Sequence, residues 1–582
     1  MDVSDFMDKD DHLSIGNIQF TSLGVISSFF DKTNLVSFVD ELLPKNRVHN
    51  VTHGECFKLL TLSTFCKTRR ALYKLCENLA DIPIFSFFHR EIDINDFNDD
   101  VLAKFFEAIH NYGTSAFFLR IVQHLAPQLP NLLHFDVLHT DITNFTVYGK
   151  YEYADVDDIA ENIIKIVLGH PKDKRFHLKC LSLALISNSL GVPVFMRELS
   201  GNCSDNKELN KIMRTFCNSI KDSINTDTIP LYIADAAFYS KDNIFDFPAN
   251  YLTRVPETNT DSRNLIYSDI ELQTMLHDSR YSFYETKSSY GGVEQTWLLV
   301  HSTEMAEKQN ATLERKLKKL MSSANGALKV LEKRAFSCQE DAEREAKIWI
   351  SKQKMCQFDT VEIISIERRA EGKKGRPKVG EKLEKNFFIR GTLIFDSEAV
   401  NRERLGVGRF ILATNNLTLS AEEILTNYKN QAKVEKCFRH LKGKEMRISE
   451  ILLKKPERIQ GLCCFMSLVM LISSLLELKL RNGLKEKEKT ISDNLGKPTS
   501  NPTLHLAFQL LETISGEIMY DKTIQQFYMQ VRVVKSPEII DILEQFGQEV
   551  LNMYLTDKII LSQTSLERFI YNYCKKNKLK IS

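Results

Sequence analysis

In the first 125 residues, four segments carry apolar residues at every third or fourth position, the period of an amphipathic helix. The segments are separated at Pro44, Gly54, Pro83 and the Asn-Asp-Asp run at 98–100. Because Asn and Asp side chains accept hydrogen bonds from the free N–H groups of a first helical turn, that run would cap the helix after it. The pattern predicts a helical N-terminal domain over residues 1–125.

From about residue 126 the pattern changes to short runs rich in β-branched and aromatic residues, which is typical of strands. A helix over 205–223 follows these runs, and further strands are predicted at 230–234 and 251–255. Consecutive strands, a helix and another strand are the layout of an α/β domain. The four runs lie at 132–143, 145–153, 178–188 and 191–199, with Gly191-Val192-Pro193 as a turn.

Residues 256–410 combine strand-like runs with a long, charge-dense helical arm over 308–355. The arm would contact DNA or a second subunit, or simply form a self-supporting helical hairpin; the pattern leaves these alternatives open. The basic stretch 371–385 reads as an exposed loop. We expect this block to be an insertion with its own strands.

After the insertion, residues 411–482 hold a predicted helix at 421–442 and an apolar helix that begins near Leu462. The most apolar part, about 15 residues with three serines, is shorter than the roughly 20 needed to cross a bilayer, so we expect a buried core helix and no membrane partner. Residues 485–503 are polar and predict a linker. The segment 483–582 is then a linker and a helical C-terminal domain, with a candidate strand at 530–534.

Charge does not mark the chain as a whole, since 77 Lys and Arg nearly balance 76 Asp and Glu. Affinity for nucleic acid would therefore come from local patches. Residues 428–458 hold ten Lys or Arg against four Asp or Glu, and residues 366–385 hold eight against four. The alternative for each patch is an ordinary solvated face.

Cysteine usage and the N-terminus both indicate a cytosolic protein. The twelve cysteines form no CxxC pair and no Cys/His cluster, which argues for reduced thiols and against zinc. The first twelve residues are acidic and lack the apolar core of a secretory signal.

Three carboxylates stand at positions suited to metal chemistry. Asp141 is predicted to end one strand and Asp235 another, while Glu435 lies on the predicted helix. Hard cations such as Mg²⁺ and Mn²⁺ prefer such oxygen ligands. The alternatives are a strand-end turn or cap for each aspartate and a solvated amphipathic helix for Glu435. Asp136 is a rival to Asp141, which we prefer because small polar residues follow it.

On that helix, the side chains of Tyr428, Gln431, Glu435 and Lys442 share one stripe. Apolar residues fall beside the stripe and would anchor the helix on a core. A carboxylate flanked by an aromatic ring, an amide and a cation suits a metal ligand next to a phosphate-binding lysine.

These motifs together resemble the bacterial insertion-sequence transposases of the DDE type, whose catalytic domain has the RNase H-like fold of retroviral integrases. The resemblance runs from about residue 20 to 480. The matching pieces are Thr140-Asp141-Ile142-Thr143-Asn144-Phe145 with Tyr148-Gly149, Gly169 to Arg175, Gly201-Asn202, Ala234-Asp235, and the helix Tyr428-x2-Gln431-x3-Glu435-x6-Lys442.

The resemblance implies that Asp141, Asp235 and Glu435 hold two Mg²⁺ ions, for which Mn²⁺ would substitute. It implies DNA contacts by Tyr428, Gln431, Arg439 and Lys442. The family usually carries Arg where this chain has Gln431, and Gln supplies no charge. Asp173 is an accessory candidate; pairing with Arg175 is its alternative role.

We therefore expect an α/β protein with an RNase H-like mixed β-sheet core, flanked by helices and built from residues 126–255 and 411–482. The insertion at 256–410 interrupts this core. The implied reaction is metal-dependent cleavage at transposon ends, followed by transfer of the 3′-hydroxyl into target DNA. The expected partners are double-stranded DNA, both terminal inverted repeats and target, and at least a second copy of the chain, in the bacterial cytoplasm at the nucleoid. The N-terminal domain would read the ends. A catalytically inactive DNA-binding derivative and a non-transposing nuclease of the same fold are the alternatives.

Overall fold

The computed structural model divides into two compact units. Unit 1 comprises residues 1–238, 246–250 and 429–582, and unit 2 comprises 239–245 and 251–428. The residues that the structure describes are 18–19, 21–45, 49–66, 74–79, 82–88, 90–149, 151, 163–169, 171, 174–203, 205–221, 229–245, 247–368, 384–431, 453–521, 523, 526–532, 536–555, 559–560 and 562–577.

The N-terminal part of unit 1 is helical, as the apolar spacing predicts. The side chain of Asn98 accepts a hydrogen bond from the Val101 N–H and caps the fifth helix, which confirms the predicted start signal. The helices are α1 (Leu23–Lys32), α2 (Leu35–Leu42), α3 (His53–Thr64), α4 (Leu75–Asn78), α5 (Asp99–Tyr112) and α6 (Thr114–Leu125), with two short 3₁₀ turns, η3 (Ile84–Phe87) and η4 (Ile94–Phe97).

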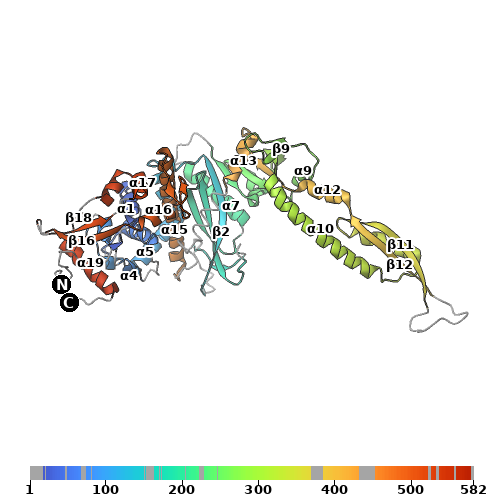
Figure 1. The fold of residues 1–582 in the computed structure, drawn as a ribbon, viewed down its shortest axis with the longest axis horizontal. Coiled ribbons are helices and arrows are strands. Elements are labelled where there is room, and N and C mark those ends of the chain that lie inside the picture. The colour runs from blue at the N-terminus through green and yellow to red at the C-terminus, as the bar shows by residue number, and fades with distance from the viewer. Residues whose placement is uncertain are drawn as a thin grey trace. The chain divides into compact units, whose positions relative to one another are not determined.

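A mixed sheet follows, with β2 (Val137–Val147) at its centre (Figure 1). The strand β2 pairs antiparallel with β4 (Lys179–Asn188) and parallel with β6 (Leu231–Ala234). On its other side β4 pairs with β3 (Val167–Leu168) and β5 (Pro193–Ser200). The β4–β5 hairpin turns at Gly191, whose positive φ of 83° suits glycine. The first two predicted runs are one continuous strand, because β4 pairs along the whole length of β2.

Helices cover both faces of this sheet. The helix α7 (Asp205–Lys221) lies on one face, where the rings of Phe216 and Phe195 of β5 are 5.1 Å apart. Glu198 points to the opposite face and accepts a hydrogen bond from the Thr114 hydroxyl of α6. Covering on both faces explains why β4 is buried almost throughout and reads as a continuous apolar run.

The helix α15 (Pro456–Glu486) is the core helix of unit 1. Within the described part of the chain it alone is long and apolar enough to cross a membrane, yet 89% of its most apolar 18-residue window is buried in the protein. Its Gly461 lies against α5, where an added Cβ would come within 2.2 Å of the Phe106 carbonyl oxygen. Four residues on, the ring of Phe465 packs against Phe57 and Phe106. The prediction of a buried core helix is confirmed.

The C-terminal residues return to the N-terminal helices. The short strand β1 (Ile18–Gln19) pairs with β16, and the Tyr554 hydroxyl donates to the Thr21 carbonyl over 2.7 Å. The C-terminal elements are α16 (Leu504–Leu511), β16 (Ser515–Asp521), β17 (Gln526–Arg532), α17 (Pro537–Phe546), α18 (Gln548–Leu555), β18 (Ile559–Ile560) and α19 (Gln563–Asn577).

The prediction of a linker at residues 485–503 is wrong. Its residues form a short hairpin of β14 (Ile491–Ser492) and β15 (Pro498–Thr499). Lys489 forms ion pairs with Asp541 and Glu544 of α17. Polar composition here reflects side chains that pair with a neighbouring helix, which composition alone does not distinguish from a solvated linker.

Unit 2 contains antiparallel strands in the order β7 (Asn250–Val255), β13 (Arg409–Thr414), β10 (Val293–Ser302), β9 (Tyr281–Tyr290) and β8 (Gln273–Thr274), with α8 (Lys241–Ile244) and α9 (Thr260–Ile266) beside them in the chain. The sequence pattern did not predict β9. The residues of this strand are half-buried or exposed along its whole length. Ser240 caps α8, since its hydroxyl accepts a hydrogen bond from the Asn243 N–H.

The predicted helical arm is present in unit 2 and has its own small cores. The helix α10 (Thr303–Leu331, green in Figure 1) is followed by α11 (Gln339–Ser351), the hairpin of β11 (Cys356–Arg368) and β12 (Glu384–Phe395), and α12 (Ser397–Gly406). One cluster centres on Leu328 and Ile389, and another on Leu317 and Val400. The arm supports itself through these contacts.

Candidate active site

Two of the predicted metal ligands lie just beyond the parallel pairing of β2 with β6 and share its register offset. In this parallel pair Val137 lies opposite Leu231 and His139 opposite Ile233, an offset of 94 residues. Asp141 and Asp235 are also 94 residues apart. Because adjacent strands lie about 4.8 Å apart, carboxylates at one level of neighbouring strands can share a ligand.

Asp141 does not end a strand, contrary to the prediction. It lies within β2, opposite Leu185 of β4, because the antiparallel pairing continues to Val147. What ends at this level is the parallel partner, since β6 stops at Ala234. The half-buried Asp141 carboxylate accepts a hydrogen bond from the Ile142 N–H over 2.7 Å. Its position is therefore held by the pairing of β2 with β4.

Asp235 follows β6 and is exposed. Its carboxylate accepts a hydrogen bond from the Ala237 N–H over 3.0 Å, and its carbonyl accepts one from Phe238 over 3.1 Å, which starts the 3₁₀ turn η5 (Ala236–Phe238). The strand-end turn expected as an alternative is therefore present. It does not preclude metal binding, since a carboxylate offers about four lone-pair sites.

The rival carboxylate Asp136 lies at the wrong end of the parallel pair. Its carbonyl accepts from the N–H of Leu231, the first residue of β6, and its side chain lies 3.6 Å from His134. Five residues of strand, about 16 Å, separate it from Asp141. The sheet therefore favours Asp141 over Asp136 as the partner of Asp235.

The third predicted ligand, Glu435, lies outside the described residues, as do Arg439, Lys442 and the accessory candidate Asp173.

The helix α13 (Ala421–Lys429) in front of that segment is described. The carboxylate of Glu423 accepts from the Ser420 N–H and hydroxyl and caps its start. The Tyr428 ring packs on Phe410 with centroids 6.2 Å apart. The prediction of one continuous helix over 421–442 is wrong, because α13 ends at Lys429 and Gln431 lies in a turn.

The described part of the candidate site offers the carboxylate oxygens of Asp141 and Asp235. Among the residues that the structure describes, no group of three His, Cys, Asp or Glu gathers as a metal centre. The two aspartates fit a hard divalent cation by donor type, and a third carboxylate would have to come from elsewhere in the chain.

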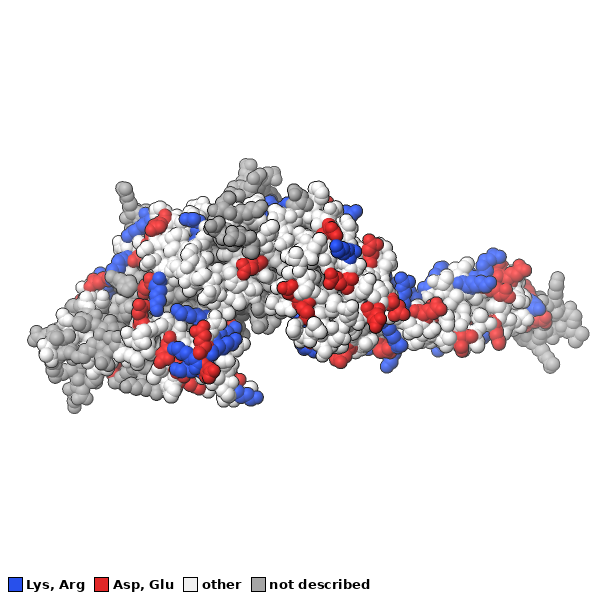
Figure 2. Space-filling view, turned by 90° about the horizontal axis from the view of Figure 1, so that it is seen from above, with Lys and Arg blue, Asp and Glu red and all other residues white. Residues whose placement is uncertain are grey.

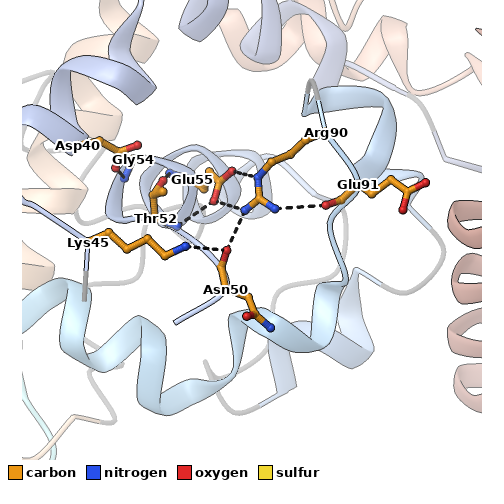
Figure 3. A network of polar contacts seen from close by, with 8 residues as sticks. All are labelled: Asp40, Lys45, Asn50, Thr52, Gly54, Glu55, Arg90 and Glu91. Atoms are coloured by element: carbon orange, nitrogen blue, oxygen red, sulfur yellow. Dashed lines mark hydrogen bonds and ion pairs between the residues drawn. The ribbon is translucent and has the colours of Figure 1, made fainter. Parts of the chain in front are cut away.

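Sequence reasoning missed a polar network in the N-terminal helices (Figure 3). The Arg90 guanidinium donates to both oxygens of Glu55, over 2.6 and 2.7 Å, and to the Asn50 carbonyl over 3.0 Å. Glu55 in turn accepts from the Thr52 N–H over 2.8 Å, which closes a capping box at the start of α3. The Thr52-x-x-Glu55 spacing was the available signal. This network fixes where α3 begins.

A second missed residue is Glu198, wholly buried between β5 and α15. Thr114 donates to one carboxylate oxygen over 2.8 Å, and the other oxygen has no hydrogen-bond partner among the described residues. Burial raises the pKa of Glu198 to about 7. No sequence signal marked it, since a single Glu in an apolar strand is compatible with an exposed position.

The mixed sheet with helices on both faces is consistent with the RNase H-like fold of the DDE class, and the comparison with known families agrees. The family model described as "Transposase DDE domain" matches residues 140–472, more than half of the chain. The chain belongs to this family. A "Domain of unknown function (DUF4277)" matches residues 14–123, the N-terminal helices. None of the curated proteins matches the chain.

Proposed function

We propose that this protein is a DNA transposase that cleaves transposon ends and transfers the freed 3′-hydroxyl into target DNA. Asp141, Asp235 and Glu435 would carry the reaction. The observation that supports this proposal most is the 94-residue offset of the β2–β6 pairing, which is also the separation of Asp141 and Asp235 in the sequence. In-line phosphoryl transfer depends on the exact positions of the reacting groups. A sheet covered by helices on both faces would hold such positions.

The three carboxylates would hold two divalent cations, Mg²⁺ or in its place Mn²⁺. When bound, such a pair activates the attacking oxygen and stabilises the leaving oxygen. The protein's own part is orientation: the pairing with β4 would hold Asp141, and the Ala237 N–H would hold Asp235. The DNA contacts proposed on the α13 side are Tyr428, Gln431, Arg439 and Lys442.

DNA binding would use local patches. Blue and red side chains are interspersed on the described surface shown in Figure 2, so no single-sign field on that face would attract DNA. We propose that the N-terminal domain at 1–125 reads the terminal repeats and that at least two copies pair the ends. The insertion at 256–410 and the segment 483–582 would support this assembly, at the bacterial nucleoid.

The decisive experiment is a cleavage and strand-transfer assay on duplexes carrying the inverted repeats that flank the reading frame. Glu435→Gln and Asp141→Asn should each abolish Mg²⁺-dependent activity, whereas Asp136→Asn should retain it. Activity retained in Glu435→Gln would reject the proposed metal site. Inactivity of the unaltered chain, with intact binding to the ends, would favour the inactive derivative.

The turn at Gln431 gives a second test. Gln431→Arg adds a cation in the segment where relatives of this class carry one, so it should tighten binding to end duplexes and steepen the salt dependence by about one unit of slope. Gln431→Leu is the matched variant without charge. Equal affinity and equal slope in both variants would show that this side chain does not face DNA.

A further inference from the structure

Large apolar side chains are exposed where β2 leaves the sheet. Tyr148 is 63% exposed, Leu168 57% and Phe176 55%, in a sheet whose other apolar residues are mostly buried. Pairing puts Val147 opposite Lys179 and Lys179 opposite Leu168, so the ends of β2, β4 and β3 lie abreast. The sheet-tip cluster denotes Tyr148, Leu168, Arg175 and Phe176.

Cations surround these apolar side chains. Residues 163–179 contain five Lys or Arg and one acidic residue, Asp173. The Arg175 guanidinium donates to the Tyr148 hydroxyl over 3.1 Å, which orients the charge at the edge of the cluster. Lys174 is exposed beside it. Positive charge next to exposed apolar groups is therefore a feature of this tip.

Two glycines hold the tip in place. A Cβ on Gly169 would come within 2.0 Å of the Gly201 carbonyl oxygen, and a Cβ on Gly201 within 2.1 Å of the Cys180 carbonyl oxygen. Any larger residue would push β3 away from β4. The backbone that carries Leu168 is thus packed against its neighbours.

This combination has a known chemical use. Lys and Arg that neutralise phosphates, together with Phe or Leu side chains that enter between base steps, are how many proteins bind the minor groove of duplex DNA. A cluster of exposed apolar side chains commonly marks an interaction site.

The position along β2 sets the expected place on DNA. Tyr148 follows Asp141 by seven residues, about 23 Å along an extended strand. Duplex DNA rises about 3.4 Å per base pair, so this span corresponds to about seven base pairs.

We propose that the sheet-tip cluster is a minor-groove contact to duplex DNA, about seven base pairs from the phosphate held at Asp141 and Asp235. Arg175 and Lys174 would pair with phosphates, and Phe176 and Leu168 would enter the groove. The position relative to the cut rests on the proposed function, whereas duplex binding by the cluster does not.

Binding is tested without metal, so that catalysis plays no part. The probe is a fluorescein-labelled 30-base-pair duplex of mixed sequence, followed by anisotropy. The double variant Leu168→Ser with Phe176→Ser should weaken binding about tenfold with little change in salt slope. Arg175→Ala should also lower the slope by about one.

The controls are matched surface changes elsewhere in unit 1. Leu495 is 79% exposed and Tyr571 46% exposed, so Leu495→Ser with Tyr571→Ser removes similar apolar area. Lys497→Ala removes one exposed cation. Affinity losses equal to those of the controls would overturn the proposal. Because cleavage is measured separately, failure here and failure of the metal site are distinguishable.

A photo-crosslinking residue, p-benzoylphenylalanine, at position 176 locates the contact. Crosslinks to the inverted-repeat duplex about seven base pairs from the cut support the contact on end DNA. Crosslinks only to a target duplex support the same contact with target DNA as its source. Crosslinks to neither duplex, or only beyond about fifteen base pairs, overturn it.

Discussion

The sheet of unit 1 and the arm of unit 2 differ in how far their strands and helices are buried. In unit 1, β4 has pairing strands on both edges and helices on both faces, and it is buried almost throughout. In the arm, β11 and β12 form a two-stranded ribbon, and many of their side chains are half-buried or exposed. Of the residues of α10, five are buried: Leu313, Leu317, Ala324, Leu328 and Leu331.

The difference shows where each kind of structure is useful. A two-stranded ribbon is marginally stable without further packing, so the arm depends on its two small clusters. Carboxylates that must stay within a fraction of an ångström of a working geometry need a frame with little freedom. Asp141 and Asp235 lie in such a frame.

The largest expected effect is on catalysis. Asp235→Asn keeps the shape but removes the charge of a proposed metal ligand, so the cleavage rate should fall about a thousandfold or more. Because Asp235 is exposed, the melting temperature should hardly change. Asp100→Asn, an exposed change in α5, is the control. Wild-type rates in Asp235→Asn would remove Asp235 from the site.

Glycine substitutions compare packing in the two regions directly. Gly461→Ala puts a Cβ 2.2 Å from the Phe106 carbonyl oxygen and should destabilise unit 1 by about 3 kcal/mol. Gly326→Ala in α10 meets nothing within 4 Å and should stabilise the arm by about 0.5–1 kcal/mol. Denaturant unfolding measures both. Equal effects in the two variants would contradict the contrast.

The buried carboxyl of Glu198 should make unit 1 sensitive to pH. Its pKa is raised to about 7 in the fold by burial, above its usual value near 4.5. The folded state therefore holds the proton more tightly, and stability should be lost as pH rises from about 4.5 through 7. Glu198→Gln should remove this loss and be more stable by up to about 3 kcal/mol above pH 7.

Melting temperatures between pH 5 and 8 test this expectation, with Glu314→Gln on the exposed face of the arm as control. Parallel pH profiles for the Glu198→Gln variant and the unaltered protein would show that Glu198 does not titrate in this range.

A core truncation in the arm should act locally. Leu328→Ala removes a buried side chain from one cluster and should cost the arm about 2 kcal/mol. Hydrogen exchange should speed up for β12 and α11 while β2 and β4 stay protected. Val330→Ala, at a residue 71% exposed, should do neither. Faster exchange in β4 would mean that the two regions unfold together.

The smallest effect is expected for the ion pair of Lys308 with Glu304 on α10. Both side chains are largely exposed, and the pair spans one helical turn. Lys308→Ala should leave the free energy of unfolding nearly unchanged, because water and salt screen an exposed ion pair. A larger loss in high-salt buffer, where the pair is screened, would point to packing by the lysine stem.

Most elements were readable from the sequence because their signals are local. The cap at Asn98, the α7 helix and the apolar run of α15 each depend on residues a few positions apart. The strand β9 was missed because its run is mostly polar, although its partner β10 follows after only Gly291 and Gly292. The hairpin in the supposed linker was missed because polar composition does not reveal that Lys489 pairs with Asp541 of α17.

The candidate site divides in the same way. The sequence by itself determined that two aspartates follow or occupy apolar strands and that Glu435 falls in a helical pattern, and the resemblance selected Asp141, Asp235 and Glu435. Only the tertiary structure decided that Asp141 lies inside a strand, that Asp136 lies about 16 Å away along it, and that Asp235 follows the strand that pairs in parallel with β2. Strand register is set by pairing between segments 94 residues apart, and no local pattern contains it.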